Sequence, residues 1–139
     1  MPRVLKYPAL FSLGGSLYPA LELLFRGYTH WTMAVAGGVC LPLLYAIAVK
    51  SRVPLPMKWF AGGAAITAVE FVTGFTVNIL LGWNVWSYAD AAYNVMGQIC
   101  LPFSLLWVLL SAPAMWMCEV MERKVFRAVE GTYENVGGA

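Results

Sequence analysis

Four long stretches of this chain are apolar and almost free of charge, and they restrict its fold more than any other feature. The stretches are residues 7–25, 31–49, 59–81 and 93–118. Within them, only Glu22 and Glu70 carry a formal charge. A helix of about 20 apolar residues crosses a hydrocarbon core about 30 Å thick, so each stretch is long enough to span a bilayer. The fourth is long enough either to span it with tilt or to carry an interfacial entry segment. We therefore predict an all-α membrane protein with four transmembrane helices that contact the lipid bilayer.

The positive charges lie mostly on one side of these stretches. Only Arg26 lies on the other side, among nine Lys and Arg residues. Cytoplasmic loops carry the excess of Lys and Arg, so we expect a multi-pass protein of the cell (plasma) membrane with both termini cytoplasmic. A cleaved signal peptide explains the first stretch less well, because no Ala-x-Ala-like site follows it and Glu22 interrupts it. The eight residues on the cytoplasmic side are Arg3, Lys6, Lys50, Arg52, Lys58, Arg123, Lys124 and Arg127.

The two halves of the chain share landmarks in the same order. A Gly-Gly pair stands seven residues before a Glu in both halves, in residues 14–22 and 62–70. Further along, the segment GGVCLP at residues 37–42 matches GQICLP at residues 97–102. We interpret these matches as a duplicated helical hairpin, with both copies in the same orientation. Chance recurrence of Gly, Pro and apolar residues is the alternative.

The duplication also defines the domain organisation that we expect. The two similar hairpins cover about residues 8–49 and 57–118. Together they form a single four-helix transmembrane domain over residues 1–118, and residues 119–139 form a short cytoplasmic C-terminal tail.

Glu70 lies 11 residues into the third stretch, near its middle. An ionisable side chain at mid-membrane costs about 3 kcal/mol on insertion scales and is a candidate functional residue by default. On a helix it shares one face with Gly63, Thr67, Gly74 and Asn78. These small and polar residues either line a substrate, ion or proton site, or hold neighbouring helices together through hydrogen bonds.

Three more polar side chains belong to the same candidate site. Asn94 and Gln98 are four residues apart at the start of the fourth stretch, so on a helix they project from one face toward the polar face of the third stretch. Glu22 is equivalent to Glu70 in the duplication, whereas a pair with Arg26, four residues later, would place it near the outer interface. The candidate substrate or ion site comprises Glu70, Asn78, Asn94, Gln98 and Glu22.

Aromatic residues gather near the connections on the Arg26 side. We expect Trp31, Trp83, Trp86 and Tyr88 to anchor the protein at the headgroup interface, and stacking on a ligand is the alternative. The sequence has no Gly-rich phosphate loop and no nucleophile with a nearby His and carboxylate. We therefore expect no enzyme activity, no metal and no cofactor. The net charge of only +2 also gives no reason to expect nucleic-acid binding.

The same landmarks carry a resemblance to a known family. It rests on the segments ELLFRGYTHW (22–31), EFVTG (70–74), LGWNVWSY (81–88) and NVMGQICLPFS (94–104), together with Asn78. In these segments the chain resembles the bacterial inner-membrane family of ABC-transporter permeases of type IV, also called CmpB-like, and the resemblance covers about residues 10–118. It implies a transport role with an ATPase supplied by a separate protein.

Two functions follow from these observations. The first is a small transporter-like or channel-like permease subunit with a polar intramembrane site around Glu70. Four helices enclose only a narrow cavity, so we expect a homodimer or a complex with a partner membrane protein. The second is a non-transporting membrane scaffold or regulatory subunit, in which the same polar residues only hold the helices together.

Overall fold

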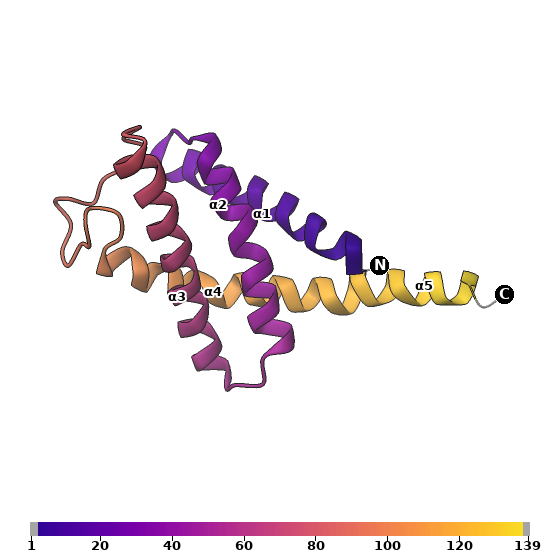
Figure 1. Cartoon of the computed structure of the whole chain (residues 1–139). Helices are drawn as coiled ribbons and strands as arrows, with labels where there is room; N and C mark the ends of the chain where they lie inside the picture. The colour runs from indigo at the N-terminus through magenta and orange to yellow at the C-terminus, as the bar shows by residue number, and fades with distance from the viewer. Residues whose placement is uncertain (1–2, 138–139) are drawn as a thin grey trace.

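The computed structural model describes residues 3–137. Residues 1–2 and 138–139, the outermost parts of the predicted transmembrane domain and tail, lie outside the described residues. Over the described range the chain is helical apart from its connections, contains no β-strand, and has four helices long and apolar enough to cross a membrane (Figure 1). The prediction of an all-α protein with four apolar helices of membrane-spanning length is confirmed.

The helices form four continuous rods, three of which include π-helical turns. The elements are α1 (Arg3–Arg26), α2 (Trp31–Tyr45), η1 (Ala46–Lys50), α3 (Leu55–Gly74), η2 (Phe75–Leu80), α4 (Leu101–Met121), η3 (Glu122–Phe126) and α5 (Arg127–Gly137). The fourth rod, from α4 to α5, is about 55 Å long at about 1.5 Å per residue. It exceeds a core about 30 Å thick, and α5 extends away from the other helices (Figure 1).

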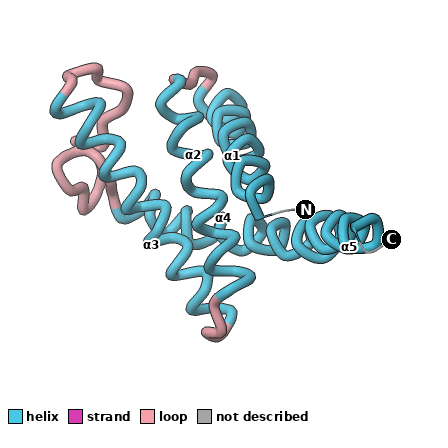
Figure 2. The backbone as a smooth tube through the Cα atoms, turned by 45° about the vertical axis from the view of Figure 1, so that its right-hand side comes forward, coloured by secondary structure: helices cyan, strands magenta, loops and turns pink. Residues whose placement is uncertain are grey.

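Glycines bring the helices together in two antiparallel pairs, α1 with α2 and α3 with α4. A Cβ atom on Gly37 would lie 2.5 Å from the Cβ of Tyr18. One on Gly63 would lie 2.9 Å from the backbone nitrogen of Val108. Small residues are required where helix backbones approach this closely. Helix α2 joins the two pairs because it also contacts α3 and α4 (Figure 2).

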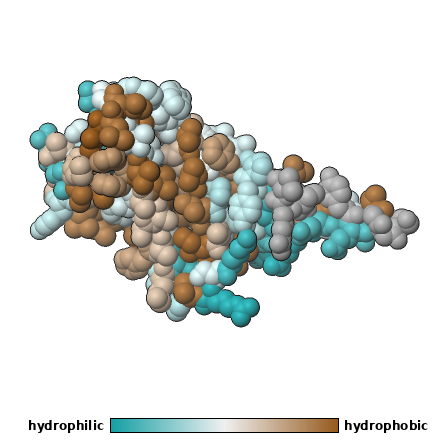
Figure 3. All heavy atoms as spheres, in the orientation of Figure 1, coloured by the Kyte–Doolittle hydropathy of each residue, from teal (hydrophilic) through white to brown (hydrophobic). Residues whose placement is uncertain are grey.

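Apolar side chains cover the outside of the bundle. Phe25 and Leu109, for example, are 84% and 72% exposed. Hydrophobic residues spread over the four-helix part of the face in Figure 3, and hydrophilic ones gather toward α5 and the α2–α3 connection. A water-soluble protein rarely exposes so much contiguous apolar surface, so the outside of the bundle suits contact with lipid.

The largest buried core lies toward the α2–α3 connection, at what we call the Lys50 end of the bundle. Leu10, Leu44, Tyr45, Met115 and Cys118 meet there and are at most 4% exposed. They come from α1, α2 and α4, so this core fixes the relative positions of three helices. The opposite end, where α1 ends and α2 begins, is called the Arg26 end.

Charged side chains join α1, α2 and η3 at the Lys50 end. The Nζ atom of Lys6 lies 3.4 Å from Oε2 of Glu122, and Nε of Arg127 lies 3.6 Å from Oε1. The Tyr45 hydroxyl donates a hydrogen bond to the Glu122 carboxylate, and Lys6 also lies over the rings of Tyr45 and Phe126. Two cations, from α1 and α5, thus neutralise Glu122, and the Tyr45 hydroxyl of α2 adds a hydrogen bond.

The connection between α3 and α4, residues 81–100, is longer than predicted. The fourth helix begins at Leu101, whereas the apolar stretch begins at residue 93, so residues 93–100 form an entry segment and not part of a tilted span. Tyr93, Met96 and Gly97 have φ values of +52°, +54° and +72°. Left-handed backbone of this kind interrupts a right-handed helix, so the segment folds as turns.

The turns also change the comparison between the two halves of the chain. Residues 37–42 lie inside α2, whereas residues 97–102 cover the end of the loop and the first turn of α4. The second pair of matching segments therefore occupies different structural positions. The first pair is placed more similarly, because both Gly-Gly motifs lie where a helix meets its hairpin partner.

Candidate functional site

Glu70 lies inside the bundle, on the third rod, and is 6% exposed. The Tyr88 hydroxyl donates a hydrogen bond to its Oε2 atom over 3.1 Å. The indole N–H of Trp107 approaches its Oε1 atom at 3.4 Å. The carboxyl group therefore joins α3, the 81–100 loop and α4. Among residues 3–137, no salt bridge involves Glu70.

The helical register of α3 explains why Glu70 faces these partners. Thr67, one turn earlier, donates a hydrogen bond to Ser104 of α4 over 3.1 Å. Gly74, one turn later, is so close to the loop that a Cβ atom would lie 2.8 Å from Trp86. The stripe of small and polar residues thus faces α4 and the loop, and Glu70 lies in its middle.

Tyr88 is a hydrogen-bond donor fixed by its surroundings. Burial, together with the neighbouring Glu70 carboxylate, raises the pKa of Tyr88 above its ordinary value. A phenol in such a place keeps its proton, so it donates to Glu70 and does not compete with it for a cation.

Asn78 and Gln98 are brought together, and Asn78 lies two turns beyond Glu70 on the third rod. The Asn78 amide donates to the Gln98 side-chain oxygen over 2.7 Å and accepts from the backbone N–H of Val85 over 2.6 Å. The Gln98 side-chain amide donates to the Met96 carbonyl. The Gln98 backbone carbonyl accepts from the Trp86 indole at 3.1 Å. These bonds hold the loop over the end of the third rod. Neither amide bonds Glu70 directly.

Asn94 lies apart from this group. Its side chain donates to the carbonyls of Ala89 and Ala91 and accepts from the backbone N–H of Gly97. The shared helical face predicted for Asn94 and Gln98 is wrong, because the segment is a turn. Asn94 stabilises the loop.

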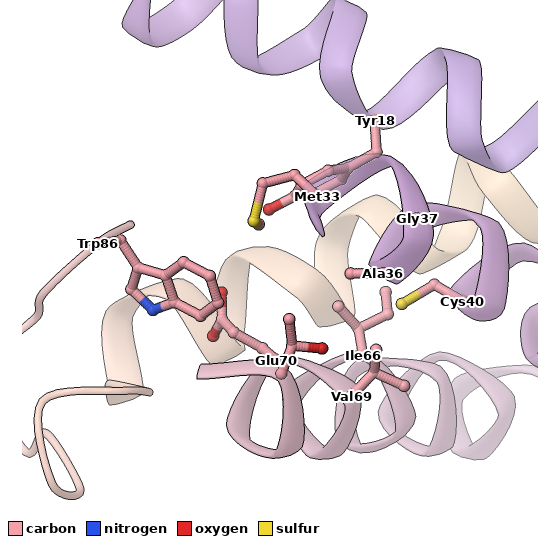
Figure 4. Close-up of a pocket in the computed structure, with 10 residues that line it drawn as sticks. Tyr18, Met33, Ala36, Gly37, Cys40, Ile66, Val69, Glu70 and Trp86 are labelled. Carbon is pink, nitrogen blue, oxygen red and sulfur yellow. The ribbon is translucent and has the colours of Figure 1, made fainter. Parts of the chain in front are cut away.

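A small cavity adjoins Glu70. It is lined by residues of α1, α2, α3 and the 81–100 loop, including Tyr18, Met33, Cys40 and Trp86. Figure 4 shows the Trp86 ring beside the Glu70 side chain, with Met33 and Tyr18 across the cavity. Its volume of about 20 Å³ is enough for about one water molecule. We call it the Glu70 cavity.

A larger polar pocket, here called the Arg26 pocket, opens at the Arg26 end. Its volume is about 240 Å³, and Glu22, Arg26, Thr29 and His30 contribute to its lining. Arg26 donates to Glu22 over 3.0 Å, and Thr29 lies 3.4 Å from the same carboxylate. Of the two alternatives for Glu22, the structure contains the pair with Arg26. Glu22 and Glu70 therefore occupy separate pockets.

The four predicted interfacial aromatics divide into two groups. Trp31 and Trp83 are 64% and 47% exposed and stack with His30 and each other at the Arg26 end. Trp86, in contrast, is 7% exposed, and Tyr88 reaches inward to Glu70. The turn after η2, with Gly82 and Asn84 at positive φ, directs this part of the loop back into the bundle.

Sequence reasoning missed three residues of the site, Trp107, Met33 and Tyr18. Trp107 carried a usable signal, because an indole N–H inside an apolar helix usually needs an acceptor and Glu70 is the nearest buried one. Tyr18 lies 6.0 Å from Trp107, measured between ring centroids. Met33 had no signal in the sequence, since it is one of many apolar residues in its span.

Of the comparisons with known proteins, the one with protein families found a match. No curated protein and no solved structure matches the chain. A family described as "Putative ABC-transporter type IV" matches residues 22–137, a range that includes Glu22, Glu70, Asn78, Asn94 and Gln98 but not Tyr18. The earlier resemblance is thereby confirmed, and the chain belongs to this family of ABC-transporter-related membrane proteins.

Proposed function

We propose that this chain is a transport subunit of the cell membrane whose binding group is Glu70. The observation that carries the proposal is a buried carboxyl group, midway along a membrane-length helix, next to a cavity and without a salt bridge among the described residues. Charged groups inside membrane spans are costly and usually serve ion or substrate pathways. The family description supports a transport role.

The orientation of the subunit follows from its charges. Lys50, Arg52 and Lys58 lie at one end of the bundle, and Arg26 is the basic residue at the other. The positive-inside rule supports a cytoplasmic Lys50 end, with both termini in the cytoplasm and the Arg26 pocket open to the outside. Glu70 then lies between the two surfaces.

The proposed duplication rests on the first half of each hairpin. In both copies a Gly-Gly motif packs against the next long helix, and a Glu follows at the same distance. The long 81–100 loop then distinguishes the second hairpin, since it brings Trp86 and Tyr88 to its Glu. Glu22 instead pairs with Arg26 and lies 3.4 Å from Thr29 of the short 27–30 connection.

The subunit is proposed to act in an assembly and not as an enzyme. The four helices leave only a cavity of about 20 Å³ beside Glu70, too small for a solute larger than a water molecule. A complete pathway for a larger solute therefore requires a second copy of the chain or a partner membrane protein. An ATPase would be a separate protein docked at the Lys50 end.

One observation favours the alternative of a membrane scaffold. Both Glu70 oxygens already face neutral donors, Tyr88 and Trp107, so the carboxyl group can act purely as a contact between helices. In that case Glu70 contributes stability and binds nothing.

Thermal unfolding of the purified protein separates the two functions. We expect the melting temperature of the wild type to change with pH or with one member of a panel of ions and metabolites, because whatever binds the folded state stabilises it. In Glu70→Gln this response is expected to vanish. Asp90→Asn is the control, because Asp90 is an exposed acid in the 81–100 loop. This variant is expected to keep the response. A uniform loss of stability in Glu70→Gln, without any ligand response in the wild type, would favour the scaffold.

A further inference from the structure

We infer that the occupant of the Glu70 site is a proton and that it enters from the Arg26 pocket through a gate formed by Met33 and Trp86. This inference rests on the proposed function and specifies its substrate and its direction of access. The step is proton transfer from a cavity water to a Glu70 oxygen, and the water recovers its proton from the Arg26 pocket.

Met33 and Trp86 separate the two spaces. Both residues line the Glu70 cavity and both line the Arg26 pocket. They are only 4% and 7% exposed and form a small apolar cluster with Val77. The barrier between a polar pocket and a buried carboxyl group is therefore about one side chain thick.

Met33 is the part of the barrier that can move. Trp86 is fixed by its hydrogen bond to the Gln98 carbonyl and by its contact with Gly74. Met has three flexible torsions and adapts its shape easily. A rotamer change of Met33 would connect the two spaces without moving a helix.

The other sides of the Glu70 cavity are less suited to protons. Between α1 and α4 lies an open groove of about 270 Å³ that shares Tyr18 and Cys40 with the cavity, but its lining is almost entirely apolar. It faces lipid, which supplies no protons. Toward the Lys50 end, the buried core around Leu44, Tyr45 and Met115 fills the bundle. The Arg26 pocket is the neighbouring space with ionisable and hydroxyl groups.

The size and the ligands of the cavity favour a proton over a metal cation. Hard cations take about six or more oxygen ligands, whereas Thr73, Tyr18 and Tyr88 are the only hydroxyl side chains that line the cavity or bond Glu70 in residues 3–137. A space for about one water suffices for proton transfer. The titratable and charged groups near enough to interact electrostatically with Glu70 are Tyr18, Glu22 and Arg26 from α1, Cys40 from α2 and Tyr88 from the loop. Helix α4 presents Trp107, which does not titrate.

Infrared difference spectra of the protein in lipid vesicles test the occupant. Between high and low pH, the wild type is expected to show a carboxylic-acid C=O band that is missing from Glu70→Gln and retained in Asp90→Asn. A wild type with no such band, whose melting temperature still responds to an ion through Glu70, would overturn the proton assignment and leave the proposed function standing. Absence of both responses would reject both.

One-sided thiol labelling tests the route. Glu70→Cys is placed in a Cys40→Ala background, where the remaining Cys100 and Cys118 are at most 1% exposed. An impermeant methanethiosulfonate reagent is added to one side of the vesicles. We expect slow labelling from the Arg26 side, because the reagent is larger than the cavity of about 20 Å³ and reacts only while the gate is open. An added Met33→Ala change is expected to accelerate labelling about tenfold, which corresponds to about 1.4 kcal/mol in the free energy of opening.

Val77→Ala is the matched control, because Val77 belongs to the same apolar cluster but lines neither space. Faster labelling from the Lys50 side, or equal acceleration by Val77→Ala, would overturn the gate. If Met33→Ala does not reach the bilayer, Met33→Val removes less volume and gives the same comparison. If labelling refutes the gate, the thermal response at Glu70 still tests the proposed function. The gate and the proposed function can therefore be rejected independently.

Discussion

Replacement of Glu122 by alanine is expected to lower the free energy of unfolding by about 3–5 kcal/mol, the usual cost of removing one partner of a buried ion pair. The Lys6 and Glu122 side chains are 11% and 12% exposed, so Lys6 would keep its charge in a largely closed site without an anion. Tyr45, itself 1% exposed, would lose its acceptor as well. The measurement is reversible unfolding of the purified protein in mixed micelles.

Two variants show whether the loss comes from the ion pair. Glu119→Ala removes an acid one turn earlier, which makes no salt bridge in the described part of the chain, and is expected to change stability little. The double change Lys6→Met with Glu122→Met should recover much of the loss, since an apolar pair leaves no uncompensated charge. Equal losses in Glu119→Ala and Glu122→Ala would contradict the role of this cluster.

Gly14→Leu is expected to have a comparable effect, a loss of about 3 kcal/mol at the upper end of the range for overpacking. A Cβ atom at Gly14 would lie 2.8 Å from the Cβ of Leu41 and too close to the Gly37 carbonyl. Both neighbouring atoms, a backbone oxygen and a Cβ atom of α2, are fixed by the α2 backbone. Only separation of α1 from α2 therefore relieves the contact. Unfolding in the same micelles measures the change.

Ala20→Leu is the control for Gly14→Leu, because Ala20 is on the same helix but exposed. It adds the same side chain to α1 on the outside of the bundle and should leave stability nearly unchanged. If the two variants unfold alike, the close α1–α2 contact is not what holds the first hairpin together.

The membrane helices could be predicted because their signal is local. A run of about 20 apolar residues has few alternatives to a membrane helix, and the ends at Arg26, Trp31 and Leu80 fall close to the predicted positions. The midspan position of Glu70 and the polar stripe around it follow from the same regular geometry.

The 81–100 loop could not be predicted, because tertiary contacts determine it. Tyr93 and Met96 adopt left-handed backbone, which bulky residues rarely do, and hydrogen bonds to Asn78 and Gln98 stabilise the turns. The apolar pattern predicted a connection between residues 81 and 93 but favoured a helix over residues 93–100. The same loop supplies Tyr88, so the hydrogen-bonded state of Glu70 could not be derived from the sequence either.

The central claim, that Glu70 is kept for binding and not for stability, is tested most directly by the unfolding free energy of Glu70→Leu combined with Tyr88→Phe. This double variant removes the buried carboxyl group together with the Tyr88 hydroxyl that donates to it, so that no hydroxyl is left unpaired. The Trp107 contact, at 3.4 Å, is the longer and weaker of the two hydrogen bonds to Glu70.

A charged side chain at the centre of a membrane helix costs about 3 kcal/mol on insertion scales, and functional groups of this kind commonly lower stability. We predict a double variant at least as stable as the wild type that has lost its pH or ligand response. A loss of about 1–3 kcal/mol, the cost of breaking a buried hydrogen-bonded contact, would contradict the claim and make Glu70 a structural contact between helices.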